Sequence, residues 1–355
     1  MTRRLAARRL VVGVLLATLL TMVLGLPTAT AQGENACAEP NDMSQNACYL
    51  GNGAEAIGFI SSGDDVDGYR FETRDFGVRV RLDLPDRPFS YRLTLVNYEG
   101  SLLSISDDAT ISATLPLPGS YYAFVESVTG EWDAGRPYRI TASMRYPSGD
   151  EPALLYSQAY AMDMVGNLIS PDGVSQQRQY SDAIGTYSYG NGRFWMQLTA
   201  QGSVEQPAAT LFTLVPDPTD PVPTLEDFSL TIDSRMTDPA DAGYSVQFRV
   251  LDPVNFYEVL VKLESRQAVI ARLVDNRLYL LTEWTSVPSL RLTGINRTVV
   301  RCEGTEIRAS INGQSIGTVR DDAFKRGLFG YGAGTWGGPT TLIFDNILVT
   351  TPTRR

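Results

Sequence analysis

Three carboxylates are concentrated in the stretch "GDDVDGYRF", which runs from Gly63 to Phe71. Asp64, Asp65 and Asp67 fall within four consecutive positions, directly before an aromatic segment. Such a group could hold calcium, a hard cation that takes about six to eight oxygen ligands. The same residue types also stabilise ordinary turns, because an Asp side chain accepts hydrogen bonds from nearby backbone N–H groups. The motif alone therefore leaves two interpretations open, a metal site and a plain turn.

Composition excludes several kinds of enzyme. The chain contains no histidine, which rules out Ser-His-Asp triads, Cys-His dyads and metal centres that need His. Glycoside hydrolysis by two carboxylates remains an alternative, but each acidic candidate in the second half also fits an outward polar position of an alternating strand. These candidates are Glu258, Glu264, Asp275 and Glu283. A net charge of -10 disfavours nucleic acid as a partner, because phosphate backbones would be repelled.

The N-terminus indicates export. Basic residues are followed by an apolar run from Leu10 to Leu26, and Ala29-Thr30-Ala31 matches a small-residue cleavage site. Residues 1–31 are therefore predicted to be a signal peptide, and the mature protein is expected outside the cell or at its surface. A membrane association is expected only if this segment stays uncleaved and serves as an anchor.

Cysteine usage agrees with an oxidising compartment. Cys37 and Cys48 lie close together after the cleavage site, and we predict that they form a disulfide that closes a short loop. The remaining Cys302 sits in the alternating segment "RTVVRCEGTEI". There we expect a small buried hydrophobic residue rather than a reactive thiol.

Period-two alternation dominates the chain after the signal segment. In "VRVRLDL", from Val78 to Leu84, apolar and charged residues alternate at every position, which is typical of a half-buried antiparallel strand. Similar segments follow at intervals marked by turn residues and predict a first β-sandwich that ends near Tyr146. The turn-rich "YPSGDEP", residues 146–152, marks the predicted boundary between domains 32–147 and 148–355.

The second domain begins with a less regular region. Four prolines in "VPDPTDPVPT" exclude a central strand and predict a long surface connection. Strong alternation returns at Phe228, and Asn312-Gly313 is a good signal for a tight hairpin. About eight successive strand candidates favour a jelly roll over an immunoglobulin topology. The predicted fold is thus all-β, with two β-sandwich domains.

Three motifs of the first domain resemble a known family. They are "AEPNDMSQNA" at residues 38–47, "GFISSGDDVDGYRFET" at 58–73 and "LPLPGSYYAFVES" at 115–127. In this order they resemble the bacterial pre-peptidase C-terminal domain, an accessory β-sandwich of secreted hydrolases, some members of which bind calcium. The resemblance implies that the fold brings two acidic segments together. The implied calcium ligands are Glu39, Asn41, Asp42, Asp65 and Asp67, with Asp64 beside them.

The second domain is similar to concanavalin A-like and laminin G-like jelly rolls related to keto-disaccharide hydrolase domains. The segments that carry the similarity are "LEDFSLTID", "DPVNFYEVLV", "GINRTVVRCEGTEIRASINGQSIGTV" and "LIFDNILV". Carbohydrate recognition is frequent among such domains. The E-x-D-x-x-E strand of retaining β-glucanases with this fold is missing, so the resemblance implies binding rather than hydrolysis.

Sugar binding on a β-sheet uses aromatic faces together with polar groups that bind hydroxyls. We expect the aromatic contacts at Tyr257, Trp284 and Trp336 and the polar contacts at Arg249 and Asn255. Trp336 is the preferred candidate, because the glycines of "YGAGTWGG" leave it little local packing. The alternative for each aromatic residue is ordinary sandwich core.

These observations predict a secreted protein that binds a polysaccharide, another glycan or a cell-envelope component and has no catalysis of its own. Two alternatives remain. One is a secreted glycoside hydrolase that uses paired carboxylates of the second domain, and the other is a structural or adhesive surface protein.

Overall fold

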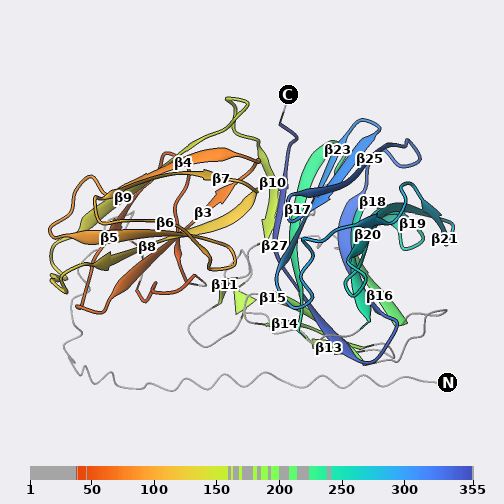
Figure 1. Ribbon diagram of the computed structural model, residues 1–355, viewed down its shortest axis with the longest axis horizontal. Coiled ribbons are helices and arrows are strands. Elements are labelled where there is room, and N and C mark those ends of the chain that lie inside the picture. The colour runs from red at the N-terminus through yellow and green to blue at the C-terminus, as the bar shows by residue number, and fades with distance from the viewer. Residues whose placement is uncertain are drawn as a thin grey trace, which may run out of the picture. The chain divides into compact units, whose positions relative to one another are not determined.

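A computed structural model of the chain describes residues 37, 39–44, 46–158, 161–162, 168–169, 179–181, 185–190, 193–199, 208–213, 224–237 and 241–353. Every regular element in these ranges is a β-strand (Figure 1). Within the same ranges, no helix has the length and apolar character needed to cross a lipid bilayer. The predicted signal peptide and the proline-rich connection at residues 216–223 lie outside the described residues.

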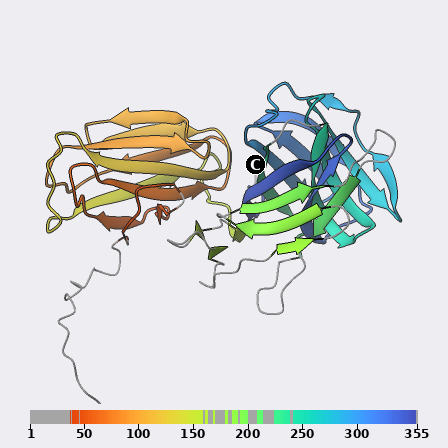
Figure 2. The same cartoon turned by 90° about the horizontal axis from the view of Figure 1, so that it is seen from below.

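The first sandwich consists of two sheets, which Figure 2 shows as two layers. The five-stranded sheet has the order β1 (Cys48–Tyr49), β3 (Val66–Thr73), β8 (Gly119–Ser127), β5 (Tyr91–Asn97) and β6 (Leu102–Ser106). The four-stranded sheet has the order β2 (Glu55–Gly58), β9 (Tyr138–Arg145), β4 (Val78–Asp83) and β7 (Thr110–Leu115). Neighbouring strands are antiparallel, except that β1 and β3 are parallel.

Alternation in the sequence explains these strands. In β4, Val78, Val80 and Leu82 are buried, whereas Arg79 and Arg81 face solvent. The strand predicted from this segment is confirmed, and its apolar side chains pack into a core that draws on both sheets. Successive side chains of a strand point to opposite faces, so one face of the strand is buried in the core and the other is exposed to solvent.

The second sandwich has two larger sheets. The first has the order β13 (Gln179–Ser181), β14 (Gly185–Gly190), β15 (Arg193–Leu198), β27 (Thr340–Thr350), β17 (Phe228–Met236), β23 (Asn296–Glu303), β24 (Glu306–Ile311) and β25 (Gln314–Arg320), and β10 (Leu154–Gln158) also pairs with β27. The second has the order β16 (Ala208–Thr213), β26 (Leu328–Thr335), β18 (Ala242–Asp252), β19 (Asn255–Lys262), β20 (Gln267–Val274) and β21 (Arg277–Leu280), and β22 (Thr285–Ser286) also pairs with β20. A separate pair joins β11 (Ala161–Met162) to β12 (Leu168–Ile169).

The fold is therefore all-β, and its second sandwich is of the jelly-roll kind, as expected. The two sandwiches have separate apolar cores, one formed by residues between 37 and 144 and the other by residues between 194 and 349. The predicted hairpin is confirmed, because Ile311 pairs with Gln314 and the intervening Asn312 and Gly313 have φ values of 50° and 81°. A tight two-residue turn demands positive φ at both positions, which Asn and Gly tolerate. The domain boundary at 147/148 stays a prediction.

Two buried features of the second sandwich differ in whether the sequence predicted them. Cys302 lies in the core of the second sandwich, as predicted. The buried ion pair between Arg297 and Asp233 was not predicted from the sequence. In this pair, Arg297 Nε and Nη2 donate to the two carboxylate oxygens of Asp233, each at 2.7 Å. Asn346 Nδ2 also donates to Asp233, at 2.9 Å, so the carboxylate is well satisfied despite its burial.

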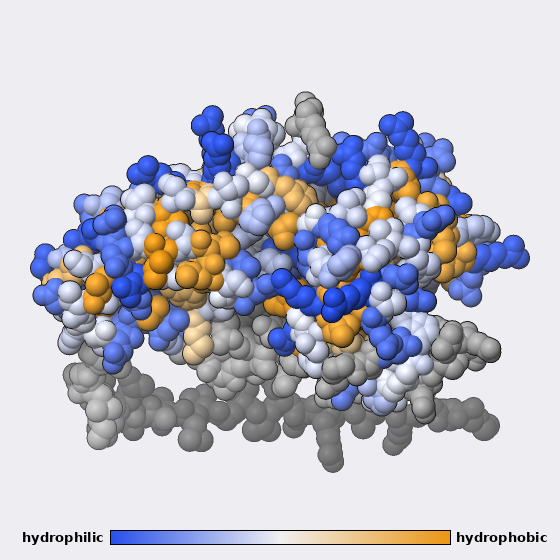
Figure 3. Space-filling model, in the orientation of Figure 1, coloured by the Kyte–Doolittle hydropathy of each residue, from blue (hydrophilic) through white to orange (hydrophobic). Residues whose placement is uncertain are grey.

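Each sandwich ends in an edge strand with exposed apolar side chains. In β6 these are Leu102, Leu103 and Ile105, and in β21 they are Leu278 and Leu280. The space-filling view shows apolar surface over both strands (Figure 3). Edge strands of this composition can pair with other chains, because their backbone N–H and C=O groups are open on one side.

Candidate functional site

One face of the seven-stranded sheet in the second sandwich carries buried polar side chains. Along β18 and β19, every second side chain enters the core, for example Val246 and Val259. The side chains between them lie on the opposite face, which we call the outward face. Three rows of residues cross this face from β19 through β18 to β26: Lys262–Gly243–Gly334, Leu260–Ser245–Gly332 and Glu258–Gln247–Gly330.

Strand β26 contributes glycine to each of these rows, so this strip of the outward face carries no side chains. Gly243 has a different role at the end of β18. A Cβ atom at this position would lie 2.1 Å from the backbone oxygen of Val261 and 3.1 Å from the ring of Trp336. Glycine is therefore required where the indole of Trp336 approaches the sheet.

Trp336 and Trp284 both lie against Lys262 at this end of the outward face. Trp336 follows the last residue of β26, and Trp284 lies between β21 and β22. The Nζ atom of Lys262 is 4.8 Å from the ring centroid of Trp284 and 5.3 Å from that of Trp336. Both distances lie within the range of about 6 Å for a cation–π contact. All three side chains are partly exposed, so this cluster forms the open end of the outward face.

Further along the same face, Ser245, Gln247 and Glu258 form a buried polar group. Gln247 is 0% exposed, and its Nε2 donates to Ser245 Oγ at 3.4 Å. The Oε1 atom of Gln247 has no hydrogen-bond partner among the described residues. A buried amide oxygen without a donor is costly, so this acceptor marks a place where a ligand hydroxyl or a water could bind.

Glu258 lies between two buried neighbours, since it pairs with Gln247 on one side and Ala271 on the other. Glu258 as a whole is 5% exposed. Burial raises its pKa to about 7, and a hydrogen bond with Ser245 offsets this only in part. No other described carboxylate contributes to the raised pKa of Glu258.

Two of the predicted ligand contacts lie in the interior instead. Arg249 is 1% exposed, and its guanidinium donates to the backbone oxygens of Glu226 (2.7 Å), Gly304 (2.8 Å) and Phe324 (3.2 Å). The β18 register shifts between Phe248 and Asp252, and simple alternation does not apply across this irregularity. The predicted role of Arg249 as a polar contact is thus corrected to a structural one.

Tyr257 is likewise a core residue, at 0% exposed. Its ring stacks on Phe248 with the centroids 5.6 Å apart, and its hydroxyl donates to Asp321. Tyr257 pairs directly with Phe248 across β19 and β18, and both point inward. Asn255 stabilises the turn before β19, since its Nδ2 donates to Asp252 and its Oδ1 accepts the N–H of Asp275. Of the five predicted ligand contacts, Trp284 and Trp336 are the two that the structure brings together.

Sequence reasoning missed Lys262, Ser245 and Gln247. Alternation in "NFYEVLVK" does place Lys262 on the same face as Glu258, and "FGYGAGT" shows a glycine at every second position. These two signals together could have located the outward face. The strand order that sets β18 between β19 and β26 could not be read from either segment.

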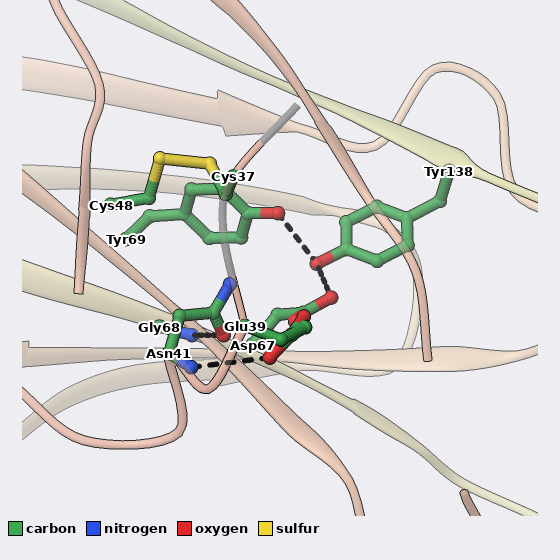
Figure 4. The surroundings of a disulfide bond; sticks show 8 residues. All are labelled: Cys37, Glu39, Asn41, Cys48, Asp67, Gly68, Tyr69 and Tyr138. Atoms are coloured by element: carbon green, nitrogen blue, oxygen red, sulfur yellow. Dashed lines mark hydrogen bonds between the residues drawn. A yellow bond between two sulfur atoms is a disulfide. The ribbon is translucent and has the colours of Figure 1, made fainter. Parts of the chain in front are cut away.

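A second candidate site lies in the first sandwich. Carboxylate oxygens of Glu39, Asp42 and Asp65 all lie within 4.8 Å of one another. The predicted proximity of the two acidic segments is therefore present in the structure. Asn41 joins them, because its Oδ1 and its backbone oxygen both accept the N–H of Gly68, at 3.2 Å and 3.0 Å (Figure 4).

Asp67 lies beneath this group and is 0% exposed. Its Oδ2 accepts the hydroxyl of Tyr138 at 2.5 Å, and that hydroxyl also contacts Tyr69 at 2.8 Å (Figure 4). Its Oδ1 accepts no N–H or O–H group of the described residues, and the carboxyl group of Glu39 lies within hydrogen-bonding range of Asp67. Burial and the neighbouring carboxylate of Glu39 raise the pKa of Asp67 to about 8.

The disulfide predicted between Cys37 and Cys48 is confirmed, with 11 positions separating the two residues. Cys48 pairs with Tyr69 on β3, so the disulfide fastens the segment that contains Glu39 and Asn41 beside the strand that contains Asp67. A constraint of this kind reduces the freedom of the unfolded chain and also holds the acidic residues near one another.

These residues suit a hard cation. The buried carboxyl group of Asp67 lies near the carboxylates of Glu39 and Asp65, and oxygen donors of this kind are the ligands that calcium prefers. The turn interpretation also has a basis, because Asp65 Oδ2 accepts the backbone N–H of Ser61 at 2.5 Å. Asp64 is outside the group of close carboxylates.

Comparisons with known proteins bear on the fold alone. No family model matches the chain, and no curated protein matches it. The resemblance of the first sandwich to the pre-peptidase C-terminal domain therefore rests on its motifs.

Among solved structures, the chain is similar to a protein of unknown function with a galectin-like fold from Bacillus subtilis (16% identity, 58% of this chain and 99% of that chain, TM-score 0.40). It is also similar to the carbohydrate-binding module CBM66 from Bacillus subtilis (14% identity, 50% and 92%, TM-score 0.33). A third structure is a putative glycosyl hydrolase from Parabacteroides distasonis (12% identity, 49% and 93%, TM-score 0.30). At these identities and TM-scores, the similarities carry no conclusion about the function of this chain.

Proposed function

We propose that the second sandwich binds carbohydrate on the outward face of its seven-stranded sheet and performs no chemistry on it. The observation that carries this proposal is that Trp284 and Trp336 both lie against Lys262 at the open end of that face, which also carries a polar group with an unsatisfied acceptor. Sugar rings present C–H-rich faces that pack on indole rings, and hydroxyls at their edges that donate and accept hydrogen bonds.

The remaining parts of the face have complementary roles in this proposal. The glycine strip of β26 leaves room for a ring to lie close to the backbone. The amide oxygen of Gln247 is fully buried and would accept from a ligand hydroxyl only once the side chains that cover it move aside, and Ser245 Oγ can then donate or accept. The exposed fraction falls from Lys262 and Leu260 to Glu258, so a ligand would enter at the tryptophan end.

The test is a glycan-array screen of residues 32–355, followed by titration of the best oligosaccharide with Trp284→Ala and Trp336→Ala. We expect each substitution to weaken binding by about 10-fold or more, since stacking on one aromatic ring contributes on the order of 1 to 3 kcal/mol. Trp132→Ala is the matched control, because Trp132 is 53% exposed and belongs to the first sandwich. If no glycan binds, the structural or adhesive alternative takes precedence, and if both tryptophan variants bind like the wild type, the site lies elsewhere.

We further propose that the acidic group of the first sandwich holds calcium and thereby stabilises the domain. Glu39, Asp42 and Asp65 would supply exposed carboxylate oxygens, and Asp67 Oδ1 would supply a buried one. Asn41 would position the segment through its bonds to Gly68 rather than bind the ion, since its Oδ1 already accepts an N–H. When bound, the cation would neutralise carboxylates that otherwise repel one another.

Thermal or urea unfolding with calcium and with chelator tests this second proposal. Extracellular modules bind calcium with a Kd of about 10⁻⁴ to 10⁻³ M, so about 5 mM calcium should stabilise the protein by about 1 to 2 kcal/mol. Asp65→Asn should abolish that gain, while Asp64→Asn should keep it, because Asp64 is outside the group. If the unsubstituted protein unfolds identically with calcium and with chelator, the acidic residues form a plain turn. The Asp65→Asn variant keeps that turn, because the Asn side-chain oxygen can still accept the N–H of Ser61.

Export also remains a proposal. A disulfide between Cys37 and Cys48 fits an oxidising compartment. Mass spectrometry of the native protein would locate its N-terminus. Cleavage before Gln32 is expected, and an intact residue 1 would favour the membrane anchor.

A further inference from the structure

We propose that the saccharide bound at the outward face carries an acidic group, a carboxylate or a sulfate ester, and that Lys262 binds that group. This inference rests on the carbohydrate-binding function proposed above. It adds the chemical class of the ligand and one specificity-determining residue.

The surroundings of Lys262 provide the first argument. Its ammonium group lies against the two indole rings, and none of the described carboxylates forms an ion pair with it. The chain has 40 acidic residues and a net charge of -10, yet no described carboxylate lies close enough to neutralise this ammonium. The cation–π contacts hold the ammonium in place without neutralising it, so its charge is available to an anion.

Geometry provides the second argument. An ammonium offers three donors and no acceptor, so its natural partner in a sugar is a carboxylate or sulfate oxygen. The flanking indoles can pack on the ring that carries the acidic group. Lys262 is partly exposed, and the glycine strip begins in the same row at Gly334, with Gly243 between the two residues.

The charge distribution along the face sets the orientation of the ligand. Glu258 is four residues from Lys262 on the same side of β19, a separation of about 13 Å in an extended strand. A carboxyl group there disfavours a second anion, whereas Gln247 and Ser245 beside it suit neutral hydroxyls. The acidic group should therefore bind at the tryptophan end and the neutral part of the chain toward Glu258.

A structural role for Lys262 is the competing explanation, in which the side chain only separates the two indoles. Arginine and glutamine substitutions distinguish the two. Lys262→Arg keeps the charge and the cation–π contacts, while Lys262→Gln keeps much of the length of the side chain and removes the charge. Lys325→Gln is the matched control, because Lys325 is exposed and is the other lysine of the chain.

The experiment titrates residues 32–355 with three oligosaccharides of equal length: oligogalacturonate, its carboxyl-reduced neutral counterpart, and a sulfate ester of the neutral chain. We expect at least one of the two acidic chains to bind about 10-fold tighter than the neutral chain, in line with one charge-assisted hydrogen bond. Lys262→Gln should remove this preference, and Lys262→Arg and Lys325→Gln should retain it. Raising the salt from about 0.05 to about 0.5 M should weaken acidic binding selectively.

Each outcome supports or contradicts the proposal that Lys262 binds an acidic group of the saccharide. If the carboxylate chain alone is preferred, the ligand group is a uronate, and if the sulfated chain alone is preferred, it is a sulfate ester. Equal affinity for all three chains, or a preference that Lys262→Gln leaves unchanged, overturns this inference while the carbohydrate-binding function stands. Absence of binding to every saccharide on the array and in the titration refutes the function and the inference together. Thermal unfolding of each variant establishes that it is folded.

Discussion

Replacing Glu258 with glutamine tests the burial of the outward face directly. The carboxyl group is enclosed by Gln247 and Ala271 on the neighbouring strands, and burial raises its pKa from 4.5 to about 7. Glutamine has nearly the same shape and stays neutral at every pH. The variant therefore removes the charge and little of the packing.

The magnitude follows from the linkage between protonation and folding. In the unfolded chain Glu258 titrates near 4.5, and in the folded chain at about 7. The folded state binds the proton more tightly, so this group contributes stability that is fully present below pH 4.5 and is lost as the pH rises through about 7. One pKa unit corresponds to about 1.4 kcal/mol, which gives a total of about 3 kcal/mol.

Urea unfolding of the wild type and of Glu258→Gln at about pH 4 and about pH 8 measures this effect. Relative to the wild type, the variant should gain about 3 kcal/mol in unfolding free energy between the two values. Taking the difference between the two proteins cancels the titration of all other groups. Glu264→Gln is the control, because Glu264 is exposed and its replacement should leave the pH dependence unchanged.

A gain smaller than about 0.5 kcal/mol would refute the reasoning. It would mean that Glu258 is hydrated in solution and that the outward face is open along its whole length. The polar group of Ser245, Gln247 and Glu258 would then be an ordinary solvated surface, and the ligand would no longer be expected to enter only from the tryptophan end.

Two other substitutions test buried residues of the second sandwich. Arg297→Met should lower the unfolding free energy by about 3 to 5 kcal/mol, because it leaves the Asp233 carboxylate buried without its cation, and denaturant titration measures the loss. Adding Asp233→Asn should restore part of the stability, and a further loss in the double variant would contradict this explanation. Cys302 should not react with a thiol reagent in the native protein, because burial raises its pKa to about 12, and it should react after denaturation. Rapid labelling of the folded protein would show that the core opens at this position.

Local sequence patterns were sufficient for much of the fold. Alternation located β4, because successive side chains in a strand point to opposite faces and only one face of that sheet is buried. Asn312-Gly313 located a hairpin, because the two residues tolerate the backbone conformation of a tight turn. The disulfide between Cys37 and Cys48 was predicted because the two cysteines lie close together in the sequence. Each of these predictions depends on residues that are neighbours along the chain.

The candidate sites were harder to predict, because they depend on which strands become neighbours. Arg249 and Tyr257 were predicted to contact a ligand, with ordinary core as the alternative for Tyr257, yet a shift in the register of β18 and the inward direction of Tyr257 place both in the interior. An alternating strand shows that two faces exist but not whether something covers the second. Glu258 was expected to be an outward polar residue, and it does point outward from the core, but its side chain is buried.

By itself, the sequence determined the class of the fold, the disulfide, the absence of histidine chemistry and the acidic residues of the first sandwich. These depend on composition and on local periodicity, which act over a few residues. Only the tertiary structure decided that β18 lies between β19 and β26, and hence that Lys262, Gly243 and Gly334 form one row beside Trp284 and Trp336. The physical reason is that strand pairing joins segments far apart in the chain, through backbone hydrogen bonds that any sequence can make and packing that no single segment specifies.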